Sequence, residues 1–140
     1  MTPAESQITG YGMAATRAAT AMLRALGGAE IFLLLPQVGM PDDPSAQLGL
    51  VDPGIEQVRL APVVVRNLPT QANGPRRRVE FLVPAGAVAD ELAARGVASA
   101  QVLLDGALGI LHNGEVFHVE DVCGECFAGT TYLYRVTAVE

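Results

Sequence analysis

The chain has 140 residues, of which half are hydrophobic and 17% are charged, and its formal net charge at pH 7 is −6. This length is enough for one domain with a real hydrophobic core and too short for two ordinary domains. The acidic balance argues against a general binder of nucleic-acid backbones, since that mode of binding needs many cations on one face.

Signals for membrane insertion or export are not evident in the sequence. The longest apolar candidate, Ile31–Pro36, falls far short of the roughly 18 residues that a spanning helix needs. The first ten residues lack the basic start and the apolar centre of a secretory signal. We therefore expect synthesis in a cytoplasm and no membrane partner, and two cysteines are too few for a disulfide framework.

The N-terminal part begins with a polar segment and continues with a helix. Residues 1–10 are poor in large apolar groups and are expected to form a flexible arm, which leaves 11–140 as a single domain. Tyr11–Leu26 has helix-forming composition, and Gly27 and Gly28 end it. Its apolar residues recur at spacings of three and four, which predicts one apolar face: Tyr11, Ala15, Ala18, Met22 and Leu26. A buried strand follows at Glu30–Pro36.

Two loops and a strand occupy the middle of the chain. Gln37–Gly54 is rich in proline, glycine and aspartate, which predicts a long excursion. Gln57–Arg66 is predicted to be a strand, in which Pro62 indicates an edge or a bulge. Asn67–Arg78 is the second loop. Because long loops in a compact domain usually have a function, we expect both loops to make contacts between subunits.

The elements that follow have clear end signals. Arg77–Val83 alternates as a strand should, and the next helix has Pro84 near its start and Gly96 past its end. Ser99 is expected to open one more helical turn. Asn113–Gly114 then lies between two apolar-rich runs and predicts a two-residue hairpin turn.

The chain is predicted to close with a β-meander whose second connection is the loop Cys123–Gly129. The order of elements predicts an α+β fold that is mainly β. We expect a small β-barrel or sandwich with an N-terminal helix and one short additional helix.

Four side chains near the C-terminus are candidate zinc ligands, and the Cys-x-x-Cys spacing is that of a zinc knuckle: His112, His118, Cys123 and Cys126. The two histidines lie on either side of the Asn113–Gly114 turn, and the cysteines lie at the far end of the outgoing strand. We therefore expect no metal site, and we interpret the histidines as residues of a half-exposed sheet.

The cysteine pair also has the spacing of a thioredoxin-like redox pair, but that chemistry depends on a helix N-terminus that lowers the pKa of the first thiol. Here the pair is predicted to lie between two strands, so a redox enzyme is not expected. A disulfide between Cys123 and Cys126, or one to another subunit in an oxidising exterior, stays open.

Charged residues in the two loops are candidate interaction residues. Arg76, Arg77 and Arg78 could meet an acidic partner or a nucleic-acid phosphate, although such a run is more often a solvated loop tip. Asp42 and Asp43 lack the spacing of a calcium-binding loop. The sequence contains no phosphate-binding glycine loop, nucleophile elbow or zinc-protease motif, so neither an enzyme nor a cofactor is expected.

The C-terminal third is similar to a known family. Its residues follow the order turn, apolar hairpin, glycine-rich loop and aromatic strand, in Asp105–Leu111, Glu115–Val119 and Phe127–Val136. With its short N-terminal helix and its strands broken by a long loop, the chain resembles the small head-tail joining proteins of tailed bacteriophages, also called head-completion or stopper proteins. The helix near Ala87–Arg95 departs from the simplest barrel-only members, which leaves tail-terminator and other neck proteins open.

The resemblance implies a non-enzymatic virion protein with a head-tail-connector-like domain, assembled in the host cytoplasm. It implies a homo-oligomeric ring with head-to-tail contacts between copies. Its partners would be neighbouring neck, portal, adaptor or tail proteins, and DNA passing through the channel. The alternative is a small zinc- or disulfide-stabilised binding module, which metal analysis of the purified chain would distinguish.

Overall fold

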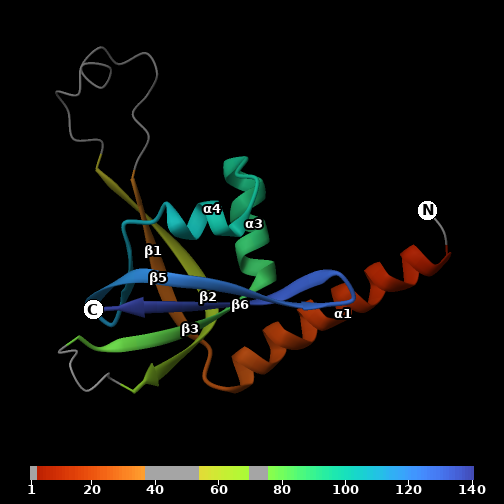
Figure 1. Ribbon diagram of the computed structural model, residues 1–140, viewed down its shortest axis with the longest axis horizontal. Helices are drawn as coiled ribbons and strands as arrows, with labels where there is room; N and C mark the ends of the chain where they lie inside the picture. The colour runs from red at the N-terminus through yellow and green to blue at the C-terminus, as the bar shows by residue number, and fades with distance from the viewer. Residues whose placement is uncertain (1–2, 37–53, 70–75) are drawn as a thin grey trace, which may run out of the picture.

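Six antiparallel strands form a closed barrel in the computed structural model, which describes residues 3–36, 54–69 and 76–140 (Figure 1). The strands are β1 (Ala29–Pro36), β2 (Ile55–Leu68), β3 (Arg78–Pro84), β4 (Gly109–His112), β5 (Glu115–Phe127) and β6 (Thr130–Val139). Their order around the barrel is β1-β2-β3-β6-β5-β4, and pairing of β1 with β4 closes it. This confirms the predicted α+β class and selects the barrel over the sandwich.

The two longest strands bend at bulges and take part in both halves of the barrel. β2 pairs with β1 as far as Val63 and with β3 from Val64, and its extra residue falls at Ala61–Pro62. Pro62 is therefore at a bulge, one of the two predicted alternatives, because a bulge tolerates the missing N–H. β5 shows the same behaviour, with its register shift between Val119 and Asp121.

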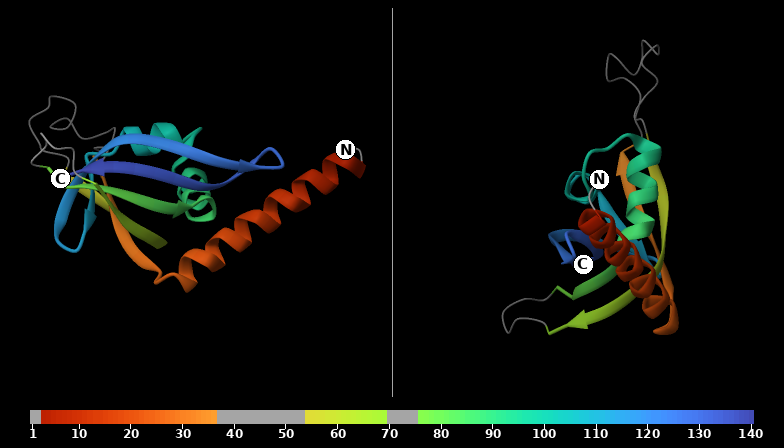
Figure 2. Two further views of the ribbon diagram at one scale, coloured as in Figure 1. Left: turned by 60° about the horizontal axis from the view of Figure 1, so that its bottom comes forward. Right: turned by 90° about the vertical axis from the view of Figure 1, so that its right-hand side faces the viewer.

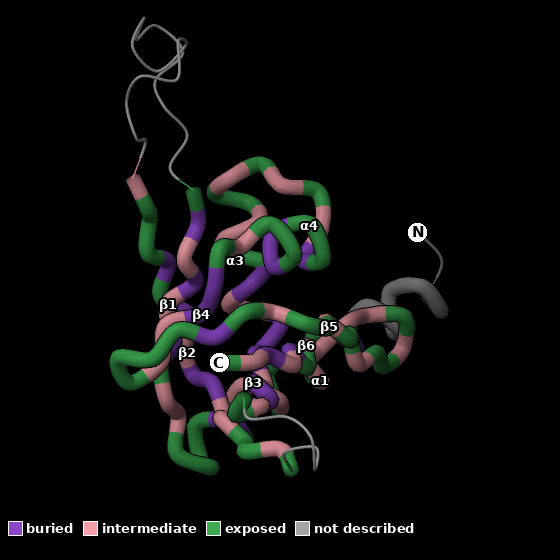
Figure 3. The backbone as a smooth tube through the Cα atoms, turned by 60° about the vertical axis from the view of Figure 1, so that its left-hand side comes forward, coloured by how far each residue is buried: buried purple, intermediate pink, exposed green. Residues whose placement is uncertain are grey.

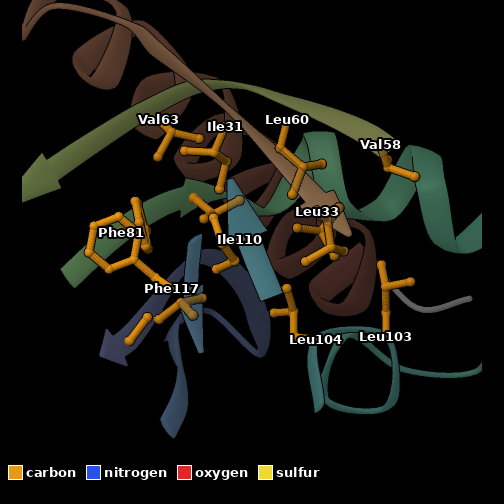
Figure 4. Packing of buried hydrophobic residues seen from close by; sticks show 14 of the residues in the cluster. Ile31, Leu33, Val58, Leu60, Val63, Phe81, Leu103, Leu104, Ile110 and Phe117 are labelled. Atoms are coloured by element: carbon orange, nitrogen blue, oxygen red, sulfur yellow. The ribbon is translucent and has the colours of Figure 1, made fainter. Parts of the chain in front are cut away.

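Aliphatic and aromatic side chains fill the barrel (Figure 4). Successive strand residues point to opposite faces, so Val79, Phe81 and Val83 of β3 are buried together. The rings of Phe81 and Phe117 meet edge to face with their centroids 5.7 Å apart. Complete burial of one such side chain stabilises the fold by about 1.5–3 kcal/mol.

Two short helices cover the barrel beside the core, α3 (Ala85–Arg95) and α4 (Ala100–Asp105). Buried residues lie mainly in the strands and in α4 (Figure 3). Gly96 ends α3 in the left-handed conformation with φ 64°, and the Ser99 side chain accepts a hydrogen bond from the Val102 N–H at the start of α4. These termini confirm the predicted end signals.

The N-terminal helix α1 (Pro3–Ala25) is longer than predicted. Residues 3–10 were expected to form a flexible arm, and their backbone is helical instead. Alanine, glutamate and glutamine are good helix formers, and proline is well tolerated in the first turn. The helix ends at the predicted glycines, where the Gly28 N–H donates to the Leu23 carbonyl over 3.1 Å. Figures 1 and 2 show α1 extending beyond the tip of the β5–β6 hairpin.

Within the described residues, none of the helices has the length and apolar character that a membrane crossing requires. The predicted excursion at Gln37–Gly54, with its candidate residues Asp42 and Asp43, falls almost entirely on residues 37–53, outside the described residues. Of the second predicted loop, Asn67–Arg78, residues 70–75 likewise lie outside the described residues. The predicted bounds of this loop were too wide, since Asn67 and Leu68 belong to β2 and Arg78 begins β3, where the two strands pair.

Candidate interaction surface

The helix α1 packs on the outside of the barrel through small residues and one leucine. Leu23 and Gly12 are buried. A Cβ at position 12 would lie 2.2 Å from the Oγ1 atom of Thr130, so glycine lets the helix approach the start of β6 closely. The hydroxyls of Thr16 and Thr20 each donate a hydrogen bond of 3.0 Å to the carbonyl one turn earlier in the helix. Both hydroxyls therefore have a hydrogen-bond partner within the helix itself.

This mode of packing leaves the large apolar residues of α1 exposed. Met22 is 63% exposed and Leu26 is 65% exposed, although both belong to the face that the sequence predicts to be apolar. Tyr11, at the other end of that face, is also exposed. The helix therefore has two apolar sides, of which the barrel covers one.

A groove runs between α1 and the β5–β6 hairpin beside the exposed side chains. It has a volume of about 460 Å³ and is lined mainly by apolar side chains. Met22 of α1 and Leu26, which directly follows this helix, border it on one side, and Phe127 borders it at the end of β5. Leu82 and Leu133 lie on the strands between them. Phe127 is itself exposed. We call Met22, Leu26 and Phe127 with this groove the α1–hairpin surface.

Water contact with grouped apolar side chains is unfavourable, so this concave apolar surface is a candidate for contact with another molecule. Apolar spacing in the sequence placed Met22 and Leu26 on one face of the helix but did not indicate what covers that face. Phe127 was placed in the predicted loop Cys123–Gly129, whereas it ends β5. The abundance of alanine and glycine on α1 was the available signal, since small residues allow a helix to dock closely on a sheet.

The two cysteines lie within β5 and not in a loop between strands. Cys123 is opposite Arg135 of β6, and Cys126 is opposite Thr131. Residues three apart in an extended strand have Cα atoms roughly 10 Å apart, whereas a disulfide spans less than about 7 Å. A disulfide between Cys123 and Cys126, which the sequence left open, does not fit this arrangement. Both thiols are free and exposed, and a bond to another subunit stays a prediction.

The two histidines lie at different places on the sheet. His112 ends β4, and its Nδ1 atom is 3.3 Å from the Glu30 carbonyl oxygen. Its ring meets Phe81 edge to face at 6.0 Å. His118 is exposed on β5 opposite Val139. In the described part of the chain, no three histidine, cysteine or acidic side chains gather in a way that could hold a metal ion.

The arginine run lies at the rim of the barrel, where two of its members contact the same chain. Arg77 pairs with Glu115 over 2.7 Å, and its guanidinium lies 5.6 Å from the centre of the Phe117 ring. Arg78 pairs with Glu120 over 2.9 Å. Arg76 is exposed and makes no ion pair with the residues that the structure describes. An external acidic partner, if present here, would therefore meet Arg76 first.

Ion pairs also connect α3 to the barrel. Arg95 donates to Glu56 of β2 over 2.6 Å and lies 3.5 Å from Glu91 one turn earlier. The hydrogen bond to Glu56 raises the pKa of the Arg95 guanidinium above its ordinary value, against a smaller lowering by burial. Arg95 therefore stays charged at any ordinary pH.

Comparisons with protein-family models, with curated proteins and with solved structures find no match to this chain. A functional proposal therefore rests on the residues and their geometry.

Proposed function

We propose that this protein is a non-enzymatic virion subunit that forms a ring at the head-tail interface of a tailed bacteriophage, where it joins the portal or adaptor to the tail. The proposal includes assembly in the host cytoplasm and localisation in the neck of the virion. Neighbouring neck or tail proteins would contact the ring, and DNA would pass through its channel.

The proposed association of copies into a ring is supported mainly by the exposed α1–hairpin surface. β4 pairs with β5 only as far as Phe117, so from His118 onward one edge of β5 has no partner strand among the described residues. The exposed Met22, Leu26 and Phe127 provide an apolar contact on the side of the barrel. Interfaces between subunits typically have an apolar core of this kind.

The neck position is supported by the resemblance of Asp105–Leu111, Glu115–Val119 and Phe127–Val136 to head-tail joining proteins. The acidic balance also fits a channel for DNA, because a wall of like charge repels the phosphates and prevents adhesion. A zinc- or disulfide-stabilised module is not favoured by any described contact, since the histidines and cysteines lie apart.

Sedimentation velocity of the purified chain, with electron microscopy of the same sample, tests the proposal. We expect a discrete oligomer that appears as a ring, and we expect mass spectrometry to detect the chain in purified virions. A chain that stays monomeric at high concentration and is missing from virions would contradict both parts.

A further inference from the structure

The strand β1 has apolar side chains on both of its faces. Ile31, Leu33 and Leu35 are buried, and Figure 4 shows the first two within the core. Phe32 and Leu34 alternate with them and therefore point out of the barrel, where both are partly exposed. An antiparallel strand with one face in water usually has polar residues at such positions. The outward side of β1 thus has the composition of a surface that another group covers.

The neighbouring strands continue this apolar surface. Phe32 lies opposite Leu111 of β4, and Leu111 lies opposite Val116 of β5, which is 41% exposed. Residues directly opposite each other share one face of a sheet. A Cβ at Gly109 would be 2.9 Å from a Val116 methyl and 4.0 Å from a Leu34 methyl, so these two side chains flank the glycine. We call Phe32, Leu34, Leu111 and Val116 the β1–β4 face.

The β1–β4 face and the α1–hairpin surface lie on opposite sides of the barrel. Within the described residues, α1 packs mainly on β6, β2 and β3, α3 packs on the same three strands, and α4 packs on β5. The groove of the α1–hairpin surface accordingly includes Leu82 of β3 and Leu133 of β6. In the closed order β1-β2-β3-β6-β5-β4, β1 is across the barrel from β6, and β4 is across from β3. Each chain therefore has two different apolar surfaces that face away from each other.

We propose that the β1–β4 face of one copy packs into the groove of the α1–hairpin surface of the next copy. The proposal rests on the ring assembly proposed above and names the two surfaces that meet in it. The outside of a barrel is convex and the groove is concave, so the two shapes are complementary. One type of contact then covers both apolar surfaces of every chain. A contact between two different surfaces is heterologous, and heterologous contacts close into a ring when the rotation between copies allows it.

The charges beside the β1–β4 face permit this contact. The face itself and the residues that line the groove are uncharged. Arg59 lies opposite Phe32 but pairs with Glu30 of its own chain. Glu115, which precedes Val116, likewise pairs with Arg77 over 2.7 Å. Burying a charge without a partner is strongly unfavourable, and these charges already have partners, so packing at the face leaves no isolated charge beside it.

Two variants test the contact from its two sides. Val116→Glu places a charge on the β1–β4 face, and Leu26→Glu places one beside the groove. Sedimentation velocity measures the assembly of each variant, and chemical denaturation of the separated chains measures its folding. We expect either change to lower the affinity between copies by about 30-fold or more, the effect of losing a central interface residue, so that each variant alone remains as single chains. Val102→Glu is the matched control, because it makes the same substitution at a 61% exposed position outside both surfaces and should assemble as the unmodified chain does.

A mixture of the two variants tests whether the two surfaces bind each other. The Leu26→Glu chain keeps an intact β1–β4 face, and the Val116→Glu chain keeps an intact groove. We expect equal amounts of the two to form a complex with one chain of each. This complex should not grow further, because its two remaining surfaces both carry a glutamate.

The other outcomes overturn the contact in distinguishable ways. Unchanged assembly of either variant would exclude its surface from the contact, while the ring proposal stands. If each variant alone stopped at two chains, each surface would bind its own counterpart in a second copy. A mixture that stays as single chains would show that the two surfaces are not partners of each other. A separated Val116→Glu chain that is much less stable than the Val102→Glu chain would show that the face is covered within its own chain. An unmodified protein that stays monomeric would overturn both this contact and the proposed ring.

Discussion

Gly12 of α1 lies directly against Thr130 at the start of β6, and the helix docks on the barrel through this contact. A Cβ at position 12 would meet the Oγ1 and Cβ atoms of Thr130 at 2.2 and 2.6 Å. Gly10, one half-turn earlier on the helix, has open space around the same atom. The two glycines therefore form a natural pair for comparison.

We expect Gly12→Ala to destabilise the protein and Gly10→Ala to stabilise it. Alanine is about 0.5–1 kcal/mol better than glycine inside a helix. At position 10 the added methyl meets no other atom, so this gain in stability is kept. At position 12 the added methyl forces α1 away from Thr130, which lowers the free energy of unfolding by about 1–3 kcal/mol. Chemical denaturation followed by circular dichroism measures both changes. Equal shifts for the two variants would show that α1 does not dock as described.

The edge-to-face pair in the core predicts a large loss of stability. Replacing Phe117 by alanine should reduce the free energy of unfolding by about 3–5 kcal/mol, because the fully buried ring leaves a cavity beside Phe81. Phe127→Ala is the matched control at a concentration at which the chains are separate, since this residue is 55% exposed in one chain. It should change the free energy of unfolding by less than about 1 kcal/mol. Similar losses at both positions would contradict the described core.

Assembly should respond to the α1–hairpin surface. We expect Leu26→Glu to shift the oligomer toward smaller species without destabilising the separated chain, because the side chain is exposed within one chain and would be buried between copies. Val102→Glu on α4 introduces the same charge at a similarly exposed apolar position and should leave assembly unchanged. Light scattering measures the oligomer size of both variants. Equal effects of the two variants on oligomer size would contradict a contact through the α1–hairpin surface.

Thiol chemistry should follow from the position of the cysteines on β5. We expect two reactive thiols per native chain without reductant, since both side chains are exposed and too far apart to bond to each other. Replacing both by serine should leave the melting temperature nearly unchanged. Stoichiometric zinc in the purified protein would require another interpretation of this strand. One thiol per chain with a covalent dimer on a non-reducing gel would show the disulfide to another subunit.

Local signals in the sequence predicted the elements whose ends depend on single residues. Asn113 and Gly114 have φ values of 50° and 79°, as a two-residue turn of the Asn-Gly type requires. Gly96 and Ser99 likewise end and begin helices as predicted. Each of these positions is decided by the backbone preference of one residue, so the neighbours in space matter little.

The errors came from features that depend on the partner in space. The sequence Cys-Gly-Glu-Cys has little β-propensity, yet β6 pairs with it and extends the hairpin to a turn at Ala128–Gly129. What covers the apolar face of α1 could not be predicted for a related reason. Apolar spacing marks a face that avoids water, but it does not say whether the same chain or another molecule covers it.

Pairing of β1 with β4 has a consequence for synthesis of the chain. Phe32 lies opposite Leu111, so the barrel closes with a residue from the first quarter of the sequence beside one from the last quarter. During translation, the segment Ile31–Leu35 therefore lacks its pairing partner β4 until nearly the whole polypeptide has left the ribosome. An apolar strand with an open edge tends to pair with other chains. Slow or interrupted translation beyond β3 should accordingly increase aggregation of the nascent protein more than it affects the finished one.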